Sequence, residues 1–103
     1  MRHFTIIIPA AGNGERLGMG PKGLLKLNNR TLIDWVSQKA LKLTPNVIIS
    51  APIELLERFT SECNGCKVIV GGKTRQESIE LLVNATTTPY ILIHDAEIGR
   101  AHV

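Results

Sequence analysis

A glycine-rich segment near the start of the chain brings together residue types that could hold phosphate. Gly12, Gly14 and Gly18 have no side chains, so the backbone there can approach a ligand closely and donate its N–H groups to phosphate oxygens. Arg16 lies inside this segment and Lys22 follows it. A guanidinium offers phosphate a planar fork of donors, and a lysine offers a compact, mobile charge. The segment therefore indicates a site for an anionic, phosphate-bearing ligand.

Two familiar phosphate-binding patterns do not match this segment. The dinucleotide fingerprint G-x-G-x-x-G has its third glycine one position before the place where Gly18 stands here. A Walker A loop needs Gly-Lys-Ser or Gly-Lys-Thr, whereas Lys22 lies between Pro21 and Gly23. An ordinary connecting loop with surface charges is the plainer alternative. The gathering of small residues and cations directly after a strand pattern favours the ligand site.

Strand and helix patterns alternate along the rest of the chain. Continuous apolar runs rich in β-branched residues predict strands, with burial expected for the first two, and apolar residues at helical spacing predict helices. The predicted strands cover 4–8, 47–50, 67–70 and 90–93, and the predicted helices cover 31–43, 53–60 and 76–85. This order predicts an α/β fold, in which a Rossmann-like parallel sheet carries helices on both faces, joined by right-handed crossovers.

The first and last helices show their buried faces in the sequence. Thr31, with Asp34 three residues on, forms a capping-box pattern at the start of the first helix, and Pro45 follows its end. The residues expected on the buried faces are Leu32, Ile33, Val36, Ala40 and Leu41 in the first helix, and Ile79, Leu82 and Val83 in the last.

Three polar or glycine-rich segments follow predicted strands, at 10–22, 71–78 and 94–95. In parallel α/β sheets, ligands bind beyond the carboxyl ends of the strands. We therefore expect the residues that carry the chemistry to come from these three segments.

Composition limits the classes of function. With 103 residues, 44% of them apolar, the chain fits one domain. A formal charge of +3 is too small to predict bulk nucleic-acid binding, and with 4% aromatic residues few side chains could stack on bases. No apolar run approaches the roughly 20 residues that span a bilayer, and the N-terminus lacks secretory architecture. We expect a soluble cytoplasmic protein, or a plastid one in a eukaryote, that binds neither nucleic acid nor membrane.

The two cysteines, Cys63 and Cys66, form a C-x-x-C pair. Zinc needs four ligands, and the three histidines of the chain do not supply a second close pair. A thioredoxin-like pair stands at a helix N-terminus, whereas Cys66 leads directly into the strand predicted at 67–70. The Asn64-Gly65 dipeptide favours a turn before that strand, with two reduced thiols.

Three motifs occur in order along the chain. The first is P-A-A-G-x-G-x-R-x-G at 9–18 with Pro21-Lys22 after it, the second is G-G-x-x-R-x-x-S at 71–78, and the third is H-D-A at 94–96. This set resembles the motifs of the 2-C-methyl-D-erythritol 4-phosphate cytidylyltransferases and of the related ribitol-5-phosphate cytidylyltransferases. The resemblance implies a fold of the nucleotide-diphospho-sugar transferase type. It also implies transfer of a cytidylyl group from CTP to a small polyol phosphate, with release of pyrophosphate.

The same resemblance implies roles for individual residues. Arg16 and Lys22 would be the catalytic cations, which align CTP and neutralise charge on the α-phosphate and the leaving group. Asp95 would lie near the ribose and α-phosphate and bind either hydroxyls or a Mg²⁺ ion, the implied cofactor, for which the resemblance assigns no ligands. The implied nucleotide-binding residues are Pro9, Ala10, Ala11, Gly12, Gly14, Gly72, Ser78, Asp95 and Ala96. An ordinary position in the first turn of a helix is the alternative for Ser78, and full-length members of the family form homodimers.

The chain departs from the family pattern at two places. Gly23 stands where the family usually has Gln, and the family's Arg-Pro does not follow Ala96. The family's domain is more than twice as long, and its second half holds the sugar phosphate and the dimerisation arm. We therefore expect residues 1–96 to be the N-terminal, CTP-binding half of a cytidylyltransferase domain, truncated after the fourth strand and inactive alone. A non-catalytic nucleotide-binding module is the alternative from another class.

The last residues have an interpretation of their own. The sequence at 98–103 matches one reading frame of a widely used sequencing-library adapter. We therefore expect residues 97–103 to be a non-native tail without function.

Overall fold

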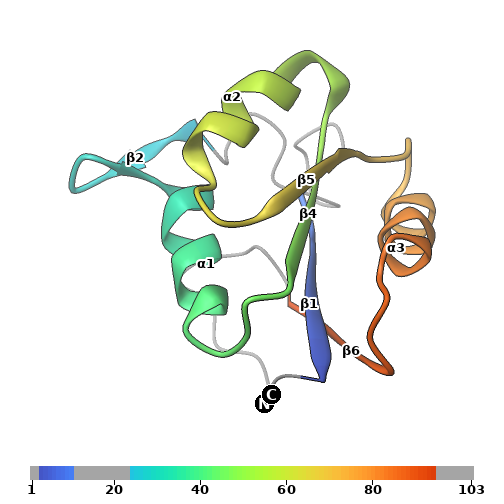
Figure 1. Ribbon diagram of the computed structural model, residues 1–103. Coiled ribbons are helices and arrows are strands. Elements are labelled where there is room, and N and C mark those ends of the chain that lie inside the picture. The colour runs from blue at the N-terminus through green and yellow to red at the C-terminus, as the bar shows by residue number, and fades with distance from the viewer. Residues whose placement is uncertain (1–2, 11–23, 95–103) are drawn as a thin grey trace, which may run out of the picture.

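A parallel sheet forms the centre of the computed structural model, which describes residues 3–10 and 24–94 (Figure 1). Its four strands within the described residues are β1 (Phe4–Pro9), β4 (Val47–Ala51), β5 (Lys67–Val70) and β6 (Tyr90–Ile93). They lie in the order β5-β4-β1-β6, and every neighbouring pair is parallel. The predicted α/β fold with a Rossmann-like sheet is confirmed, and the bounds predicted for β5 and β6 are those observed.

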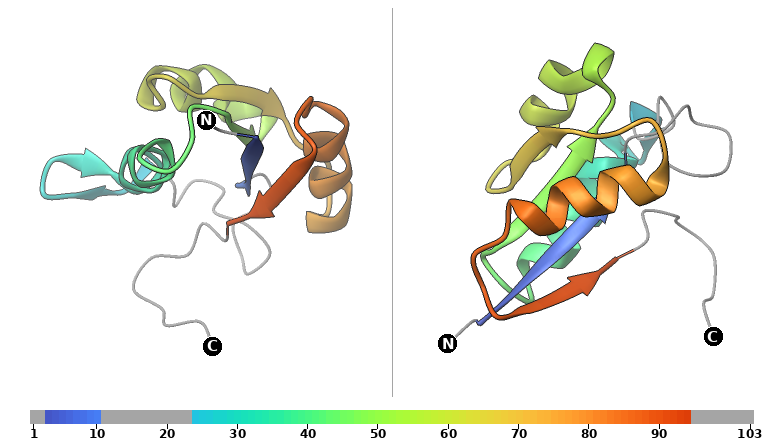
Figure 2. Two further views of the ribbon diagram at one scale, coloured as in Figure 1. Left: turned by 60° about the horizontal axis from the view of Figure 1, so that its bottom comes forward. Right: turned by 90° about the vertical axis from the view of Figure 1, so that its right-hand side faces the viewer.

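Helices cover both faces of this sheet, as the sequence predicts. Alternate residues of β1 point to opposite faces, so that Ile6 and Ile8 join the cluster packed under α1 (Leu32–Leu41) and α2 (Leu56–Glu62). Ile7 points the other way and packs with Leu82 of α3 (Arg75–Asn84). Figure 2 shows α3 on one side of the strands and the other two helices opposite it.

The first helix begins where its capping pattern predicts. The Thr31 hydroxyl accepts a hydrogen bond from the Asp34 amide at 3.2 Å and donates one to Oε1 of Glu62 at 2.9 Å. One side chain therefore caps α1 and also ties it to the end of α2. Ile33, Val36 and Ala40 are buried, while Leu32 and Leu41 are partly buried against the same cluster, so the predicted face is confirmed.

The other two helices differ in detail from the prediction. The chain from Ile53 to Leu55 forms a 3₁₀ turn (η2) after Pro52, and the α-helix starts only at Leu56. In α3, Leu82 is buried and Ile79 is partly buried, but Val83 is 39% exposed. The prediction that Val83 shares the buried face is wrong. Val83 follows Leu82 by one residue, or about 100° around the helix, so its side chain turns away from the sheet.

A hairpin that sequence periodicity did not reveal precedes α1. Strands β2 (Lys26–Leu27) and β3 (Arg30–Thr31) pair antiparallel across Asn28 and Asn29, which have φ angles of 56° and 69°. Asparagine tolerates this left-handed conformation better than most residues, so the pair suits a tight hairpin turn. The hairpin extends away from the sheet in Figure 1 and is fastened to α1 by Trp35, whose indole N–H donates to the Leu27 carbonyl at 2.9 Å.

The strand β6 forms an edge of the described sheet. It pairs with β1 on one side, and its side chains are exposed on both faces, with Leu92 at 49% on one face and Ile93 at 46% on the other. Apolar side chains on both faces of an unpaired edge are unusual, because such an edge can pair with another strand. No helix among the described residues is long and apolar enough to cross a membrane.

Candidate functional site

The end of β1 leads into the first predicted motif. Pro9 is the last residue of β1, and Ala10 follows it with no exposed surface. The Ala10 amide donates to both the backbone oxygen of Ser50, at 3.1 Å, and the Ser50 hydroxyl, at 3.2 Å. Ser50 is itself fully buried in β4. The backbone that enters the 11–23 segment is therefore held tightly against the neighbouring strand.

The Gly71-Gly72 segment follows β5 and is fixed by three backbone donors. The Gly71 amide donates to the Ala51 carbonyl at 2.9 Å, which extends the pairing of β4 with β5 by one step. The Gly72 amide donates to the Ser78 hydroxyl at 3.0 Å, and the Lys73 amide donates to Oε1 of Glu77 at 2.8 Å. Side chains from the first turn of α3 thus reach back and hold the turn that precedes their own helix.

Gly72 lies too close to α3 for any side chain. A Cβ atom added to Gly72 would lie 2.4 Å from Cβ of Glu77 and 2.9 Å from its Oε1. Carbon atoms at rest are about 3.5–4.0 Å apart, so this contact requires glycine. The close approach of the loop to its own helix is therefore a reason for the glycine that does not involve a ligand.

The N-terminus of α3 is capped in a way that the sequence also encodes. The Thr74 hydroxyl accepts from the Glu77 amide at 3.1 Å, so Thr74-x-x-Glu77 forms a capping pair. Glu77 departs from the usual capping box, because its carboxylate accepts a hydrogen bond from the Lys73 amide and not from the Thr74 amide. The positive end of the helix dipole, with Lys73 beside it, therefore lies at the carboxyl edge of the sheet.

The strand order places a topological switch point at this edge. From β1 the chain moves outward to β4 and β5 on one side and then returns to β6 on the other. The His94 amide donates to the Ile7 carbonyl at 3.0 Å and so continues the pairing of β6 with β1. Ligands of open α/β sheets bind in the crevice where strand order reverses. Gly72 stands across β4 from Ala10, about 10 Å away at the usual strand spacing.

Four of the predicted site residues fall within the described part of the chain. Pro9 and Ala10 end β1, and Gly72 and Ser78 belong to one hydrogen-bonded unit at the end of β5. Ser78 is fully buried, and its oxygen accepts from Gly72. The predicted residues that lie outside the described ranges are Ala11, Gly12, Gly14, Arg16, Lys22, Asp95 and Ala96, as does the tail at 97–103.

Two residues that shape this edge were absent from the sequence prediction. Ser50 interrupts an otherwise apolar strand, and that interruption is the signal that could have singled it out. Glu77 stands three residues after Thr74, which is the capping-box spacing. Both residues hold backbone amides of the segments that follow β1 and β5.

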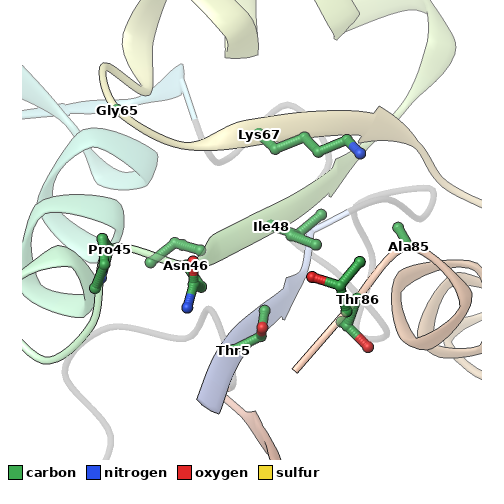
Figure 3. Close-up of a pocket in the computed structure, with 10 residues that line it drawn as sticks. Thr5, Pro45, Asn46, Ile48, Gly65, Lys67, Ala85 and Thr86 are labelled. Atoms are coloured by element: carbon green, nitrogen blue, oxygen red, sulfur yellow. The ribbon is translucent and has the colours of Figure 1, made fainter. Parts of the chain in front are cut away.

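A pocket of about 300 Å³ lies at the opposite, amino-terminal edge of the sheet (Figure 3). Thr5 of β1, Asn46 before β4 and Lys67 of β5 line it together with the segment after α3. Several polar groups there bond within the protein: the hydroxyls of Thr5 and Thr88 are 2.7 Å apart, and the Asn46 amide group donates to the Phe4 carbonyl. This pocket is therefore separate from the edge where β1, β5 and β6 end.

Comparison with known proteins decides the family. The family model described as IspD, 2-C-methyl-D-erythritol 4-phosphate cytidylyltransferase, matches residues 4–102. The chain belongs to the IspD family. The resemblance drawn from the three motifs is thereby confirmed.

Members of the IspD family from known organisms match most of this chain. The 2-C-methyl-D-erythritol 4-phosphate cytidylyltransferase of Thermus thermophilus is 37% identical over 91 residues, which cover 88% of this chain and 41% of that protein. The enzyme of the same name from Deinococcus radiodurans is 36% identical over 92 residues, covering 87% of this chain and 38% of that protein. The chain thus spans about two fifths of the length of these IspD relatives.

Solved IspD structures share the fold. The crystal structure of the Thermus thermophilus cytidylyltransferase matches with a TM-score of 0.64 and 29% identity, over 89% of this chain and 40% of that one. The bifunctional IspDF from Campylobacter jejuni matches with a TM-score of 0.77 over 92% of this chain and 26% of that one. At 20% identity the second match bears on the fold alone.

Proposed function

We propose that this chain forms the CTP-binding half of a cytidylyltransferase that acts on 2-C-methyl-D-erythritol 4-phosphate. Membership of the IspD family over residues 4–102 is the observation that carries the proposal. The construction of the carboxyl edge supports it, because the segments after β1 and β5 are both held by buried hydroxyl groups where nucleotides bind in such folds.

The proposed reaction is a displacement at phosphorus. An oxygen of the acceptor phosphate attacks the α-phosphorus of CTP, the bond from that phosphorus to the bridging oxygen breaks, and pyrophosphate leaves. The acceptor phosphate is already ionised, so no general base is needed. Catalysis then consists of alignment and of neutralising charge on the α-phosphate and the leaving group. Arg16 and Lys22 take this role in the proposal because they are the cations of the first motif.

The cytosine ring would lie against the backbone of Ala10 to Gly12 on one side and of Gly72 on the other. A base can approach a glycine backbone closely, and the observed turn keeps Gly72 in a defined place. Ser78 acts in this proposal chiefly through Gly72, since its buried hydroxyl accepts from the Gly72 amide. It is a positioning residue for the base pocket.

Mg²⁺ is the proposed cofactor. The described residues hold no group of three or more His, Cys, Asp or Glu side chains, so they contain no protein cage for a metal. Mg²⁺ is usually held through one or two carboxylates together with substrate phosphates. Asp95 is the carboxylate of the third motif that would serve. Mg²⁺ would supply charge neutralisation on the phosphates.

Two other functions are alternatives. Ribitol-5-phosphate cytidylyltransferases share the three motifs, but the relatives described above act by name on 2-C-methyl-D-erythritol 4-phosphate. The second is a non-catalytic nucleotide-binding module. We propose that the residues of this chain hold CTP, and that by themselves they do not turn it over.

Nucleotide titrations of the whole chain test the proposal. Changes in the amide spectrum with CTP and Mg²⁺ are expected for residues at the ends of β1 and β5, with ATP producing much smaller changes. Equal responses to CTP and ATP would overturn the base pocket, and a chain that responds to neither nucleotide would overturn CTP binding altogether.

An activity assay tests the proposal that the chain does not turn over alone. Pyrophosphate release is measured with CTP, Mg²⁺ and either 2-C-methyl-D-erythritol 4-phosphate or ribitol 5-phosphate. No release above the Arg16→Ala control is expected with either acceptor. Release that depends on Arg16 would show that the chain is catalytic by itself, and the acceptor that supports it would then name the substrate.

A further inference from the structure

The segment that joins α2 to β5 folds as a tight turn and brings two cysteines together. The Cys66 amide donates to the Cys63 carbonyl at 3.2 Å, so residues 63–66 close one β-turn. Gly65 has a φ of +91°, the conformation that a type II turn needs at its third residue. The ends of a β-turn lie less than about 7 Å apart between Cα atoms, and disulfides join Cα atoms about 4.4–6.8 Å apart. The backbone therefore suits a disulfide.

The two side chains also meet the same neighbours. Cys63 is buried in the cluster under α1 and α2, and Cys66 packs against that cluster while partly exposed. Ser37 of α1 is a neighbour of both: its hydroxyl offsets part of the rise that burial causes in the pKa of each thiol. Both cysteines are free in this structure.

A metal site does not explain the pair. Among residues 3–10 and 24–94, no third His, Cys, Asp or Glu joins the two cysteines to make a metal-binding group, and a structural zinc ion takes four ligands. We propose that Cys63 and Cys66 form an oxidation site, at which a hydroperoxide closes an intramolecular disulfide within the native fold. This inference is independent of the proposed nucleotide site, which lies at the other end of β5.

The proposed oxidation has two balanced steps. The Cys66 sulfur, the more exposed one, attacks a peroxide oxygen as the thiolate; the O–O bond breaks, and the departing hydroxide takes up the thiol proton as water. The Cys63 sulfur then attacks the resulting sulfenic sulfur. The S–S bond forms, the S–O bond breaks, and a second water leaves with the Cys63 proton. The two thiols lose two electrons and two protons, and one hydrogen peroxide becomes two waters.

The surroundings of the thiols set the pH at which this happens. Burial raises the pKa of Cys66 to about 11 and that of Cys63 to about 12, and the adjacent Cys66 adds to the rise at Cys63. The thiolate is the reactive form, so oxidation is slow at neutral pH and quickens by about tenfold per pH unit below the pKa of Cys66.

A redox titration of the whole chain tests the inference. The chain is equilibrated with reduced and oxidised dithiothreitol, once folded and once in urea, and the closed fraction is read by alkylation and mass spectrometry. If the fold holds the thiols in position for a disulfide, the equilibrium constant for disulfide formation (the closure constant) is at least about tenfold larger in the folded chain than in urea. That ratio corresponds to a reduction potential about 30 mV lower in the folded chain. A constant that is equal or smaller when folded would overturn the proposal.

Two further measurements sharpen the result. Hydrogen peroxide at pH 9 is expected to give a monomer that has lost two hydrogen atoms, whereas oxygen addition or linked dimers would count against the proposal. Gly65→Ala is the matched control, because an alanine resists a φ of +91° and its Cβ would meet the Leu41 side chain at 3.2 Å. This variant keeps both thiols, and its folded closure constant should fall toward the value in urea.

Discussion

Replacing Gly72 with alanine tests whether the second motif is built as the structure shows. The added Cβ would lie 2.4 Å from Cβ of Glu77 and 3.2 Å from the Glu77 carbonyl carbon. These neighbours belong to the first turn of α3, which is anchored to the sheet by buried Leu82. The clash cannot be relieved by rotating a flexible side chain, so either the loop or the helix must move.

The expected cost can be worked out along either route. If the loop stays in place, overpacking of this kind costs about 1–3 kcal/mol. If the loop moves away, it gives up the bonds from Gly72 to Ser78 and from Lys73 to Glu77, each worth about 1 kcal/mol. Both routes lead to a loss of about 2 kcal/mol in the free energy of unfolding. For a domain of this size, that loss lowers the Tm by roughly 10 °C.

Urea unfolding followed by circular dichroism measures this loss. The matched background is Glu77→Gly, which removes the Cβ that the new methyl group would strike and also the carboxylate. In that background Gly72→Ala should cost about half as much, which would appear as a coupling of roughly 1 kcal/mol in the double-mutant cycle. A cost below about 0.5 kcal/mol in the original chain, or an equal cost in both backgrounds, would refute the packing argument.

Three other outcomes are expected. Ser78→Ala should lower the free energy of unfolding, measured in urea, by about 1–2 kcal/mol because the Gly72 amide loses its acceptor. The control Ser61→Ala removes an exposed hydroxyl bonded within its own helix and should change that free energy by less than about 0.5 kcal/mol. Burial raises the pKa of both thiols from 9.0, so the unfolded chain loses its thiol protons at lower pH than the folded chain does. Stability should therefore fall as pH rises from about 9 to 11. Urea midpoints measured against pH should show this fall, and it should be smaller in Cys66→Ser. The exposed edge strand β6 should make the chain self-associate with increasing concentration, and Leu92→Lys should shift sedimentation toward the monomer; unchanged association in that variant would point to another surface.

The strands were predictable from the sequence because each is a short apolar run between turn residues. The predicted ranges 67–70 and 90–93 are the observed bounds of β5 and β6, and β1 and β4 each extend one residue further. Strands β1 and β4 are buried on both faces and therefore consist almost wholly of apolar residues. Strand β6 shows the same kind of apolar run although its side chains are exposed. The β2–β3 hairpin escaped prediction because two-residue strands are too short to show any periodicity.

The candidate site can be proposed from the sequence as motifs, but its contacts cannot. The sequence placed Gly72 and Ser78 six residues apart in one segment, and only the structure shows the hydrogen bond that joins them. Ser50 lies forty residues from Ala10 in the chain, so its bond to the Ala10 amide depends on the pairing of β1 with β4. Local patterns cannot report contacts of that range, because they follow from strand order and register.

The residues of the second motif have structural roles that do not depend on a ligand. Gly72 is required by its distance to Glu77, and Ser78 and Glu77 are required as acceptors for the two amides that follow Gly71. These demands arise from folding alone and would hold in a domain that bound no nucleotide. The turn between β5 and α3 therefore accounts for Gly72, Glu77 and Ser78 without a ligand. The argument for CTP as the proposed ligand rests instead on membership of the IspD family and on the cations Arg16 and Lys22 of the first motif, which the folding of the described sheet does not explain.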